Sequence, residues 1–232
     1  MNDLVTISGL SKAYGHFMAL NNLNLNIPRG RIIGLLGPNG SGKTTLIKLL
    51  NGLLTPSSGQ ILIDGKAPGV ETKKKVSYLP ERTYLTSSRT VIDLVEYFED
   101  FYDNFNREKA MSMLESLQIN LNSRLKTLSK GTKEKVQLIL AMSRAAKLYL
   151  LDEPIGGVDP AARDYILSTI LNNYSRDATV ILSTHLIGDI EPILDEAVFL
   201  KDGRVFAHRN AEELRETEGM SVDAYFREVF KC

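Results

Sequence analysis

A glycine-rich segment that ends in lysine and threonine is the first part of the sequence whose residue types could do chemistry. It fits the phosphate-loop pattern, in which a second glycine is followed by lysine and a hydroxyl residue. Small residues let consecutive backbone N–H groups surround phosphate oxygens, and a helix that begins near the lysine points its positive end at the same place. The segment comprises Gly37, Pro38, Asn39, Gly40, Ser41, Gly42, Lys43 and Thr44, and we count the adjoining Thr45 with it. We therefore predict a nucleotide site in which Lys43 neutralises the β- and γ-phosphates and Thr44 ligates Mg²⁺.

Two adjacent carboxylates end the apolar run at residues 148–151. In open α/β sheets, ligands bind at the carboxyl ends of the strands. Asp152 can hold Mg²⁺ or its water shell, and Glu153 can accept a proton from an attacking water. An acidic turn that only ends a strand is the plainer alternative, but the phosphate loop upstream favours the functional interpretation.

The elements that must position these residues follow from hydrophobic periodicity. The run at 32–36 is short and continuously apolar, which is typical of a strand buried on both faces of a parallel sheet, and 148–151 and 179–183 are further candidates for buried strands. Residues 4–10 and 21–27 alternate apolar and polar, the pattern of half-buried strands. Strand, loop and helix repeat in order, which predicts an α/β sheet covered by helices.

A sequence that opens a helix between the two motifs narrows the choice of protein class. Leu128-Ser129-Lys130-Gly131-Thr132 resembles the signature of ATP-binding-cassette (ABC) proteins, which is usually leucine-serine-glycine-glycine-glutamine. Other markers of that family occur in the expected order over essentially the whole chain. They are Tyr14 before the phosphate loop, Gly156-Gly157-Val158-Asp159 after the acidic pair, and Ser183-Thr184-His185 after the next buried run.

The resemblance implies a role for each marker. Tyr14 would stack on adenine, Asp159 would belong to the D-loop, and His185 would hold the γ-phosphate and the attacking water. Ser129 and Gly131 would face the γ-phosphate of ATP bound to a second subunit. Each marker also has a plain alternative: a surface tyrosine, a loop histidine, and helix caps at Ser129 and Asp159.

The catalytic assignment that follows names Glu153 as general base, with Lys43 and His185 beside it. ATP and Mg²⁺ are the expected cofactors.

Two departures from the family pattern affect the details. The family usually has glutamine after the strand that precedes its helical subdomain, whereas this chain has Glu81. A carboxylate there can still offer Mg²⁺ an oxygen, so we count Glu81 with Thr44 and Asp152 as candidate metal ligands. The signature has Lys130 for its first glycine and Thr132 for its glutamine. The family resemblance associates such variants with bacterial exporter-type systems for peptides or drugs.

Composition limits the partners. Lysine plus arginine equals aspartate plus glutamate, at 28 each among 232 residues, which argues against a nucleic-acid partner. The one cysteine, Cys232, leaves no intrachain disulfide and fits a reducing compartment. No signal peptide and no apolar run of about 20 residues is present. We therefore expect a soluble chain at the inner face of the cell membrane, held there by a separate permease and paired with an identical or different ATP-binding subunit.

We predict one ABC-type nucleotide-binding domain over 1–232. Its α/β core, with an antiparallel N-terminal part, would comprise 1–81 and 147–232, and a helical subdomain would occupy 82–146. The expected function is ATP hydrolysis that powers the permease in exporting a peptide, drug or similar molecule. The alternative is an ABC-type ATPase that regulates or assembles a membrane complex without transport. A chromosome or DNA-repair ATPase is disfavoured because the insertion between the motifs has no sustained heptads.

Aromatic residues concentrate in the expected helical subdomain, beside acidic ones. The aromatic residues are Tyr97, Phe98, Phe101, Tyr102 and Phe105, and the acidic residues are Asp93, Glu96, Glu99, Asp100 and Asp103. An amphipathic helix with a solvated acidic face explains most of this pattern. Tyr97 and Phe101 extend beyond the core stripe, so we also predict a groove near Tyr84, Tyr97 and Phe101 that receives a short basic helix of the permease.

Overall fold

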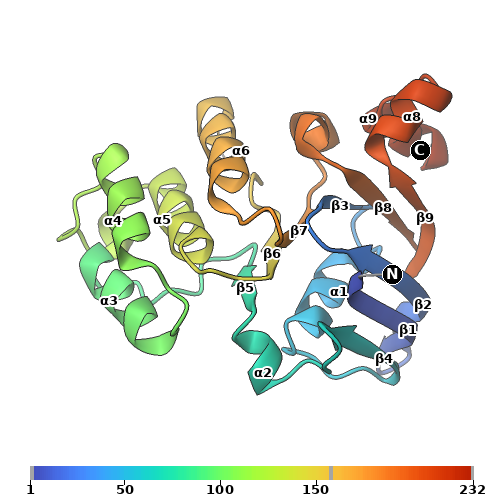
Figure 1. The fold of residues 1–232 in the computed structure, drawn as a ribbon, viewed down its shortest axis with the longest axis horizontal. Coiled ribbons are helices and arrows are strands. Elements are labelled where there is room, and N and C mark those ends of the chain that lie inside the picture. Colours follow the sequence, from blue (N-terminus) through green and yellow to red (C-terminus); the bar gives the residue numbers. More distant parts are fainter. Residues whose placement is uncertain (1–2, 157–158, 231–232) are drawn as a thin grey trace.

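The computed structural model describes residues 3–156 and 159–230 and shows two sheets with helices around them (Figure 1). The larger sheet has six strands in the order β5-β6-β7-β3-β8-β9. Its first five strands run parallel, and β9 pairs antiparallel with β8. The strands are β3 (Ile32–Leu36), β5 (Val76–Leu79), β6 (Leu148–Asp152), β7 (Thr179–Ser183), β8 (Glu196–Lys201) and β9 (Arg204–Asn210). Every residue of β3, β6 and β7 is buried, which confirms the prediction of a two-sided parallel core.

The smaller sheet is antiparallel and has the order β2-β1-β4. Its strands are β1 (Asp3–Tyr14), β2 (Phe17–Pro28) and β4 (Ser58–Ile63). Buried residues of these strands share one apolar cluster with β3 and with α1 (Lys43–Leu50), so the two sheets enclose α1 between them. The α/β fold with an antiparallel N-terminal part is thereby confirmed.

Three helices form a separate lobe on the left of Figure 1: α3 (Val91–Phe101), α4 (Arg107–Ser116) and α5 (Lys130–Met142). Polar caps fix where these helices begin. Thr90 accepts a hydrogen bond from the Asp93 N–H, and Asn106 and Ser129 cap α4 and α5 in the same way. The lobe has its own apolar cluster around Val95, Leu114 and Ile139. The opposite side of α5 packs into the cluster of the parallel sheet through Leu138 and Met142.

The remaining helices cover the parallel sheet and its edges. α2 (Val70–Lys73) precedes β5, and α6 (Pro160–Asn173) lies between β6 and β7. After β7 come α7 (Ile187–Ile190) and the short 3-10 helix η2 (Glu191–Ile193), whereas η1 (Leu125–Thr127) precedes α5. The helices α8 (Ala211–Thr217) and α9 (Val222–Val229) follow β9. No helix in the described part of the chain is both long and apolar enough to cross a membrane.

Candidate nucleotide site

The glycine-rich segment forms a tight loop between β3 and α1, and two of its glycines are sterically required. A Cβ on Gly37 would lie 2.4 Å from the Leu200 carbonyl oxygen. Gly42, which precedes α1, has a φ of 108°, and a Cβ there would lie 2.6 Å from Leu20. The loop backbone is therefore held close to neighbouring strands in a conformation that side chains would prevent.

Lys43 folds back over this loop and is only 8% exposed. Its Nζ donates to the carbonyl oxygens of Gly37 at 2.7 Å and Pro38 at 3.2 Å. Burial lowers the pKa of Lys43, while the nearby carboxylates of Glu153 and Asp152 act in the opposite direction. A phosphate would supply the anionic partner that a buried ammonium requires.

Ser41 gives an independent test of whether the loop suits phosphate. Its hydroxyl is buried, and the described residues offer it no hydrogen-bond partner. A buried polar atom without a partner is costly, and a bound ligand is one way to satisfy it. The loop therefore combines a cation, an unsatisfied hydroxyl and the start of a helix.

The predicted magnesium ligands Thr44 and Asp152 are brought together. The Thr44 hydroxyl donates to Asp152 Oδ1 at 3.2 Å, and the Ser183 hydroxyl donates to the same atom at 2.7 Å. Asp152 is 2% exposed, and burial raises its pKa although these two hydrogen bonds lower it. Hydroxyl and carboxylate oxygens are the ligands that Mg²⁺ prefers, so this pair fits the ion. The carboxylate of Glu81 is near enough to raise the pKa of Asp152 further.

Beyond these oxygens, the described residues contain no group of three or more histidine, cysteine or acidic side chains that could hold a metal by themselves. Because Mg²⁺ usually keeps several waters and binds substrate phosphates, a site with few protein ligands suits it.

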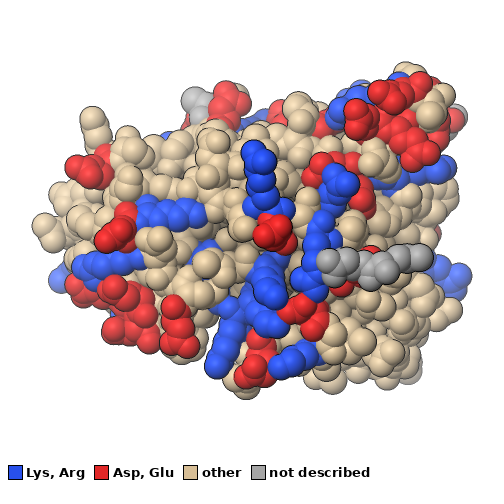
Figure 2. Space-filling view, viewed as in Figure 1, with Lys and Arg blue, Asp and Glu red and all other residues tan. Residues whose placement is uncertain are grey.

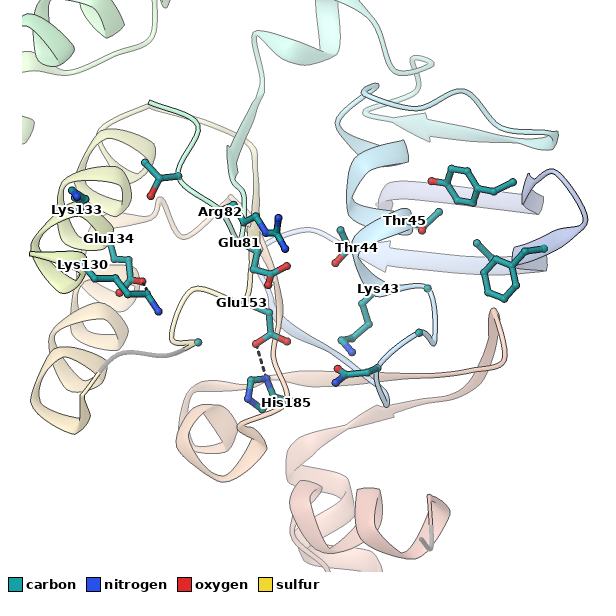
Figure 3. A pocket seen from close by; sticks show the side chains of 18 residues that line it. Lys43, Thr44, Thr45, Glu81, Arg82, Lys130, Lys133, Glu134, Glu153 and His185 are labelled. Atoms are coloured by element: carbon teal, nitrogen blue, oxygen red, sulfur yellow. Dashed lines mark hydrogen bonds and ion pairs between the residues drawn. The ribbon is translucent and has the colours of Figure 1, made fainter. Parts of the chain in front are cut away.

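Glu153 occupies a strained position directly after β6, with a φ of 51°. Its N–H donates to the Ser183 carbonyl oxygen at 3.0 Å, which fixes the backbone at the sheet edge. The side chain turns toward His185, and Glu153 Oε2 lies 3.0 Å from His185 Nδ1 (Figure 3). Non-glycine residues with positive φ concentrate at functional sites, where the surrounding structure enforces the strain. The geometry therefore presents a carboxylate, oriented by an imidazole, toward the cavity.

A cavity of about 780 Å³ joins these groups. Its lining includes Tyr14, Asn39, Gly40, Gly42, Lys43, Thr44, Thr45, Glu81, Glu153 and His185 from the predicted set. Figure 3 shows Lys43 and Thr44 on one side, the α5 residues Lys130, Lys133 and Glu134 on the other, and Glu81, Glu153 and His185 between them.

Tyr14 lies at the mouth of this cavity and is 46% exposed. The hairpin between β1 and β2 pairs it with Phe17, a second exposed aromatic that the sequence prediction missed. Arg82, Lys133 and Glu134 line the cavity and were missed as well. Their positions in the sequence could have indicated them, because Arg82 directly follows Glu81, and Lys133 and Glu134 lie one helical turn after Lys130.

Several predicted residues do not line the cavity of the single chain: Gly37, Pro38, Ser41, Ser129, Gly131, Asp152 and Asp159. Gly37, Pro38 and Ser41 belong to the same loop as the lining residues, and Asp152 accepts a hydrogen bond from Thr44, which lines the cavity. Ser129 caps α5 by accepting from the Thr132 N–H at 3.2 Å, and a Cβ on Gly131 would meet only open space. Asp159 is exposed before α6, and its carbonyl accepts from the Arg163 N–H. Gly157 and Val158 lie outside the described residues.

The loop between a buried strand and a helix, facing an acidic pair on another strand of the same sheet, defines a P-loop nucleotide-binding protein. A sequence model of the family described as "ABC transporter" matches residues 20–156. The chain belongs to that family, as an ATP-binding and ATP-hydrolysing subunit.

Individual relatives agree with this assignment. The SkfA peptide export ATP-binding protein SkfE of Bacillus subtilis is 31% identical to this chain, and the aligned part covers 88% of this chain and 87% of SkfE. The lantibiotic transport ATP-binding protein SrtF of Streptococcus pyogenes is 28% identical, and the aligned part covers 91% of this chain and 95% of SrtF. A solved ATP-binding subunit of an ABC transporter superposes with a TM-score of 0.87 at 30% identity and covers 97% of this chain and 99% of that one.

Proposed function

We propose that this subunit powers export of a peptide or similar small molecule through a separate membrane-spanning permease, to which it binds at the inner face of the membrane. Two relatives named for peptide export and lantibiotic transport support the substrate class. The observation that supports the catalytic part is the oriented pair of Glu153 and His185, which opens onto the same cavity as Lys43.

In the proposed reaction, a water attacks the γ-phosphorus of ATP while Glu153 takes its proton. The bond between the γ-phosphorus and the β–γ bridging oxygen breaks, so ADP and inorganic phosphate are the products. Lys43 stabilises negative charge on the transferred group, and His185 keeps the Glu153 carboxylate in place. Mg²⁺, when held by Thr44 and Asp152, would neutralise phosphate charge. Glu81, which lines the same cavity between the phosphate loop and α5, is the third candidate ligand.

A second ATP-binding subunit, identical or different, would complete each site. Ser129 is exposed at the start of α5, and open space surrounds Gly131, so both are accessible to a phosphate carried by another chain. A helix N-terminus with a free approach suits an anion. Asp159 is also exposed, directly before α6, where a partner could reach it. Tyr14 and Phe17 would hold the adenine by stacking.

Export can be tested by purifying the tagged subunit from membranes of its native host and reconstituting the proteins that accompany it. We expect a multi-span membrane protein to co-purify and ATP-dependent loss of a peptide from the compartment that holds the subunit. Uptake into that compartment would contradict export. A co-purifying membrane protein that stimulates ATP hydrolysis but moves nothing would favour the regulatory alternative.

A further inference from the structure

A row of cations lies at the edge of the parallel sheet that is opposite the phosphate loop. The strands β5, β6 and β3 each begin directly after a cation, namely Lys75, Lys147 and Arg31. Arg176 stands three positions before β7, which lies between β6 and β3 in the sheet. Figure 2 shows lysine and arginine side chains gathered in the middle of the view, where Figure 1 places β5 and α2, with acidic side chains interspersed. Four neighbouring strands therefore bring positive charge to one edge.

Backbone hydrogen bonds fix the positions of these residues along the edge. The Lys75 carbonyl oxygen accepts from the Lys147 N–H at 2.8 Å, and the Lys147 carbonyl oxygen accepts from the Thr179 N–H at 2.9 Å. The Arg31 carbonyl oxygen accepts from the Val180 N–H at 2.9 Å. Neighbouring strands lie about 4.8 Å apart, so the side chains of the row begin at regular intervals. The row is therefore part of the sheet itself.

A hollow of about 760 Å³ opens at this edge, between the segments 29–31, 145–147 and 175–178. Its volume is close to that of the nucleotide cavity and within the range of ordinary small-molecule sites. Among the described residues that line it, one is acidic, Asp177, and four are cations. The cations are Arg29, Arg31, Lys147 and Arg176. We call this hollow the strand-start pocket.

Gly30 lets two of the turns around the pocket approach each other. It has a φ of 67°, and a Cβ there would lie 2.7 Å from the Arg176 carbonyl oxygen. Because glycine adopts this conformation without strain and leaves room for that oxygen, the turn with Arg29 and Arg31 lies against the turn before β7. The arrangement of the cations therefore depends on close backbone packing.

A carboxylate beside the pocket neutralises only part of the charge. Asp64 forms ion pairs with Arg29, with Lys75 at 2.5 Å and with Lys147 at 3.1 Å. Hydrogen bonds from these three cations hold the pKa of Asp64 well below its usual range, so the carboxylate stays ionised. One negative charge thus meets three positive charges, and the group keeps a positive excess.

Arg31 and Arg176 leave hydrogen-bond donors available to a ligand. The Arg31 side chain is 49% exposed and lies 3.5 Å from Asp195. The other oxygen of Asp195 accepts from the Ile32 N–H at 2.7 Å, so that carboxylate is already shared with the backbone. Arg176 is exposed, and within the part of the chain that the structure describes it forms no ion pair. Two guanidinium groups, each with several N–H donors, can therefore bind one anion.

Cations at this edge could instead serve the carboxyl ends of helices, which are electronegative. Another residue already meets that need. Lys109 Nζ donates to the Met142 carbonyl oxygen, at the end of α5, at 2.8 Å. It also donates to the Asn173 carbonyl oxygen, at the end of α6, at 2.6 Å. The exposed cations of the strand-start pocket are therefore not required for these two helix ends.

We propose that the strand-start pocket binds a compact oligophosphate, at a site separate from the nucleotide cavity. Planar guanidinium groups bind phosphate oxygens through paired hydrogen bonds, and several linked phosphates match several neighbouring cations. Arg31 and Arg176 bind the phosphates within the pocket, and Lys147 neutralises charge on the side of β6. Inorganic oligophosphate and the phosphates of a free nucleotide share this chemistry. The site takes no part in the proposed hydrolysis, because the phosphate loop and the acidic pair lie at the other edge of the sheet.

Calorimetric titration of the full chain with inorganic tripolyphosphate, at low salt and without Mg²⁺, tests the proposal. The phosphate loop can also bind this probe, so we expect two sites in the unaltered chain. Arg31→Gln with Arg176→Gln should weaken one site by about tenfold or more, because charge-assisted hydrogen bonds are lost. Lys43→Ala should weaken the other site and leave the strand-start pocket to be measured alone. In Lys43→Ala, competition by ADP would identify a nucleotide as the occupant, and its absence would identify inorganic oligophosphate.

A matched pair of changes controls for the loss of charge. Arg204→Gln with Arg227→Gln removes two exposed cations of β9 and α9 and should leave both sites intact. If Arg31→Gln with Arg176→Gln does not fold, Arg176→Gln alone, on an exposed turn, should still weaken the same site. A single site that Lys43→Ala abolishes, or equal weakening by the control pair, would overturn the proposal. ATP binding by the unaltered chain is measured in parallel, and its absence would contradict the proposed function instead.

Discussion

The α/β core and the helical lobe differ in the residues that build them and in the surfaces that they present. In the core, strands buried on both faces hold a phosphate loop, an acidic pair and a histidine within a few ångströms of one another. The lobe is built from capped amphipathic helices and leaves Tyr84, Tyr97 and Phe101 exposed. The core thus has the rigidity that chemistry on phosphate requires, and the lobe has the apolar surface that a partner requires.

The two regions also differ in how closely they follow the family pattern. The phosphate loop and the acidic pair, both at strand ends in the core, match it residue for residue. The departures are Lys130 and Thr132 in α5 of the helical lobe, and Glu81, which lies between α5 and the phosphate loop. The residues expected to contact phosphate and Mg²⁺ at the strand ends therefore follow the pattern, and the changes of charge lie outside the phosphate loop and the acidic pair.

Lys43→Ala should have the largest effect and should act on the core alone. Removing the only side-chain cation that the phosphate loop holds should lower ATP affinity and reduce kcat by about 10²–10³-fold. ATP titration and a steady-state phosphate assay measure both. Lys66→Ala, an exposed lysine between β4 and α2, is the matched control and should change neither. Retained turnover in Lys43→Ala would remove this residue from the catalytic set.

Two variants that each remove a buried leucine side chain, one in the core and one in the lobe, test whether the two regions unfold separately. Leu150 in β6 and Leu114 in α4 are both fully buried, and each change to alanine should cost about 2–5 kcal/mol. Hydrogen exchange should show faster opening throughout the chain for Leu150→Ala. Leu114→Ala should affect mainly α3 and α4, with ATP binding preserved. Identical exchange patterns would mean that core and lobe are one cooperative unit.

Ser129→Ala distinguishes a helix cap from a ligand of phosphate. Loss of the cap alone should destabilise α5 by about 1 kcal/mol. If Ser129 also faces the phosphate of a second subunit, ATP hydrolysis should fall by more than that loss explains. Ser129→Asn retains a capping side chain but not the hydroxyl, and it should restore stability without restoring hydrolysis. Full activity in the asparagine variant would leave Ser129 as a cap only.

Glu81→Gln should have the smallest effect. If the carboxylate approaches Mg²⁺, the Mg²⁺ concentration for half-maximal ATP hydrolysis should change by a few-fold, since one oxygen ligand loses its charge. Glu71→Gln, on exposed α2, serves as control. An unchanged Mg²⁺ titration would show that the loop after β5 directs Glu81 elsewhere.

Much of the core could be predicted from the sequence, because a continuous apolar run bounded by glycine or acid is typical of a buried parallel strand. The runs at β3 and β6 carried that signal, β7 carried a shorter apolar run of three residues, and the motifs at the ends of these strands located the site. β4, β8 and β9 were not predicted. The first three residues of β4, 58–60, are all exposed, so this strand lacks an alternating pattern. The four-residue apolar run in β8 is too short to distinguish a strand from a helix.

The missed site residues depend on tertiary structure. Phe17 reaches the cavity only because the Gly15 turn, with a φ of 58°, pairs it with Tyr14. The hollow between the end of β5 and α3 is another case, because Lys73, Arg82 and Arg144 line it without any aspartate or glutamate, whereas the sequence analysis emphasised the acidic residues of α3. Arg144 follows α5 in sequence, yet its guanidinium lies under β5 and α2. Such contacts join elements about 70 positions apart and leave no local periodicity in the sequence.

The central claim is that Glu153 acts as the general base of an ATP site in the core. The most direct test is single-turnover hydrolysis by Glu153→Gln, with ATP binding measured on the same sample. Glutamine keeps the size of the side chain but cannot take the proton, so we expect unchanged ATP affinity and turnover lowered by about 10²–10⁴-fold. Light scattering should then detect an ATP-bound dimer. Hydrolysis at a near-normal rate by this variant would contradict the account.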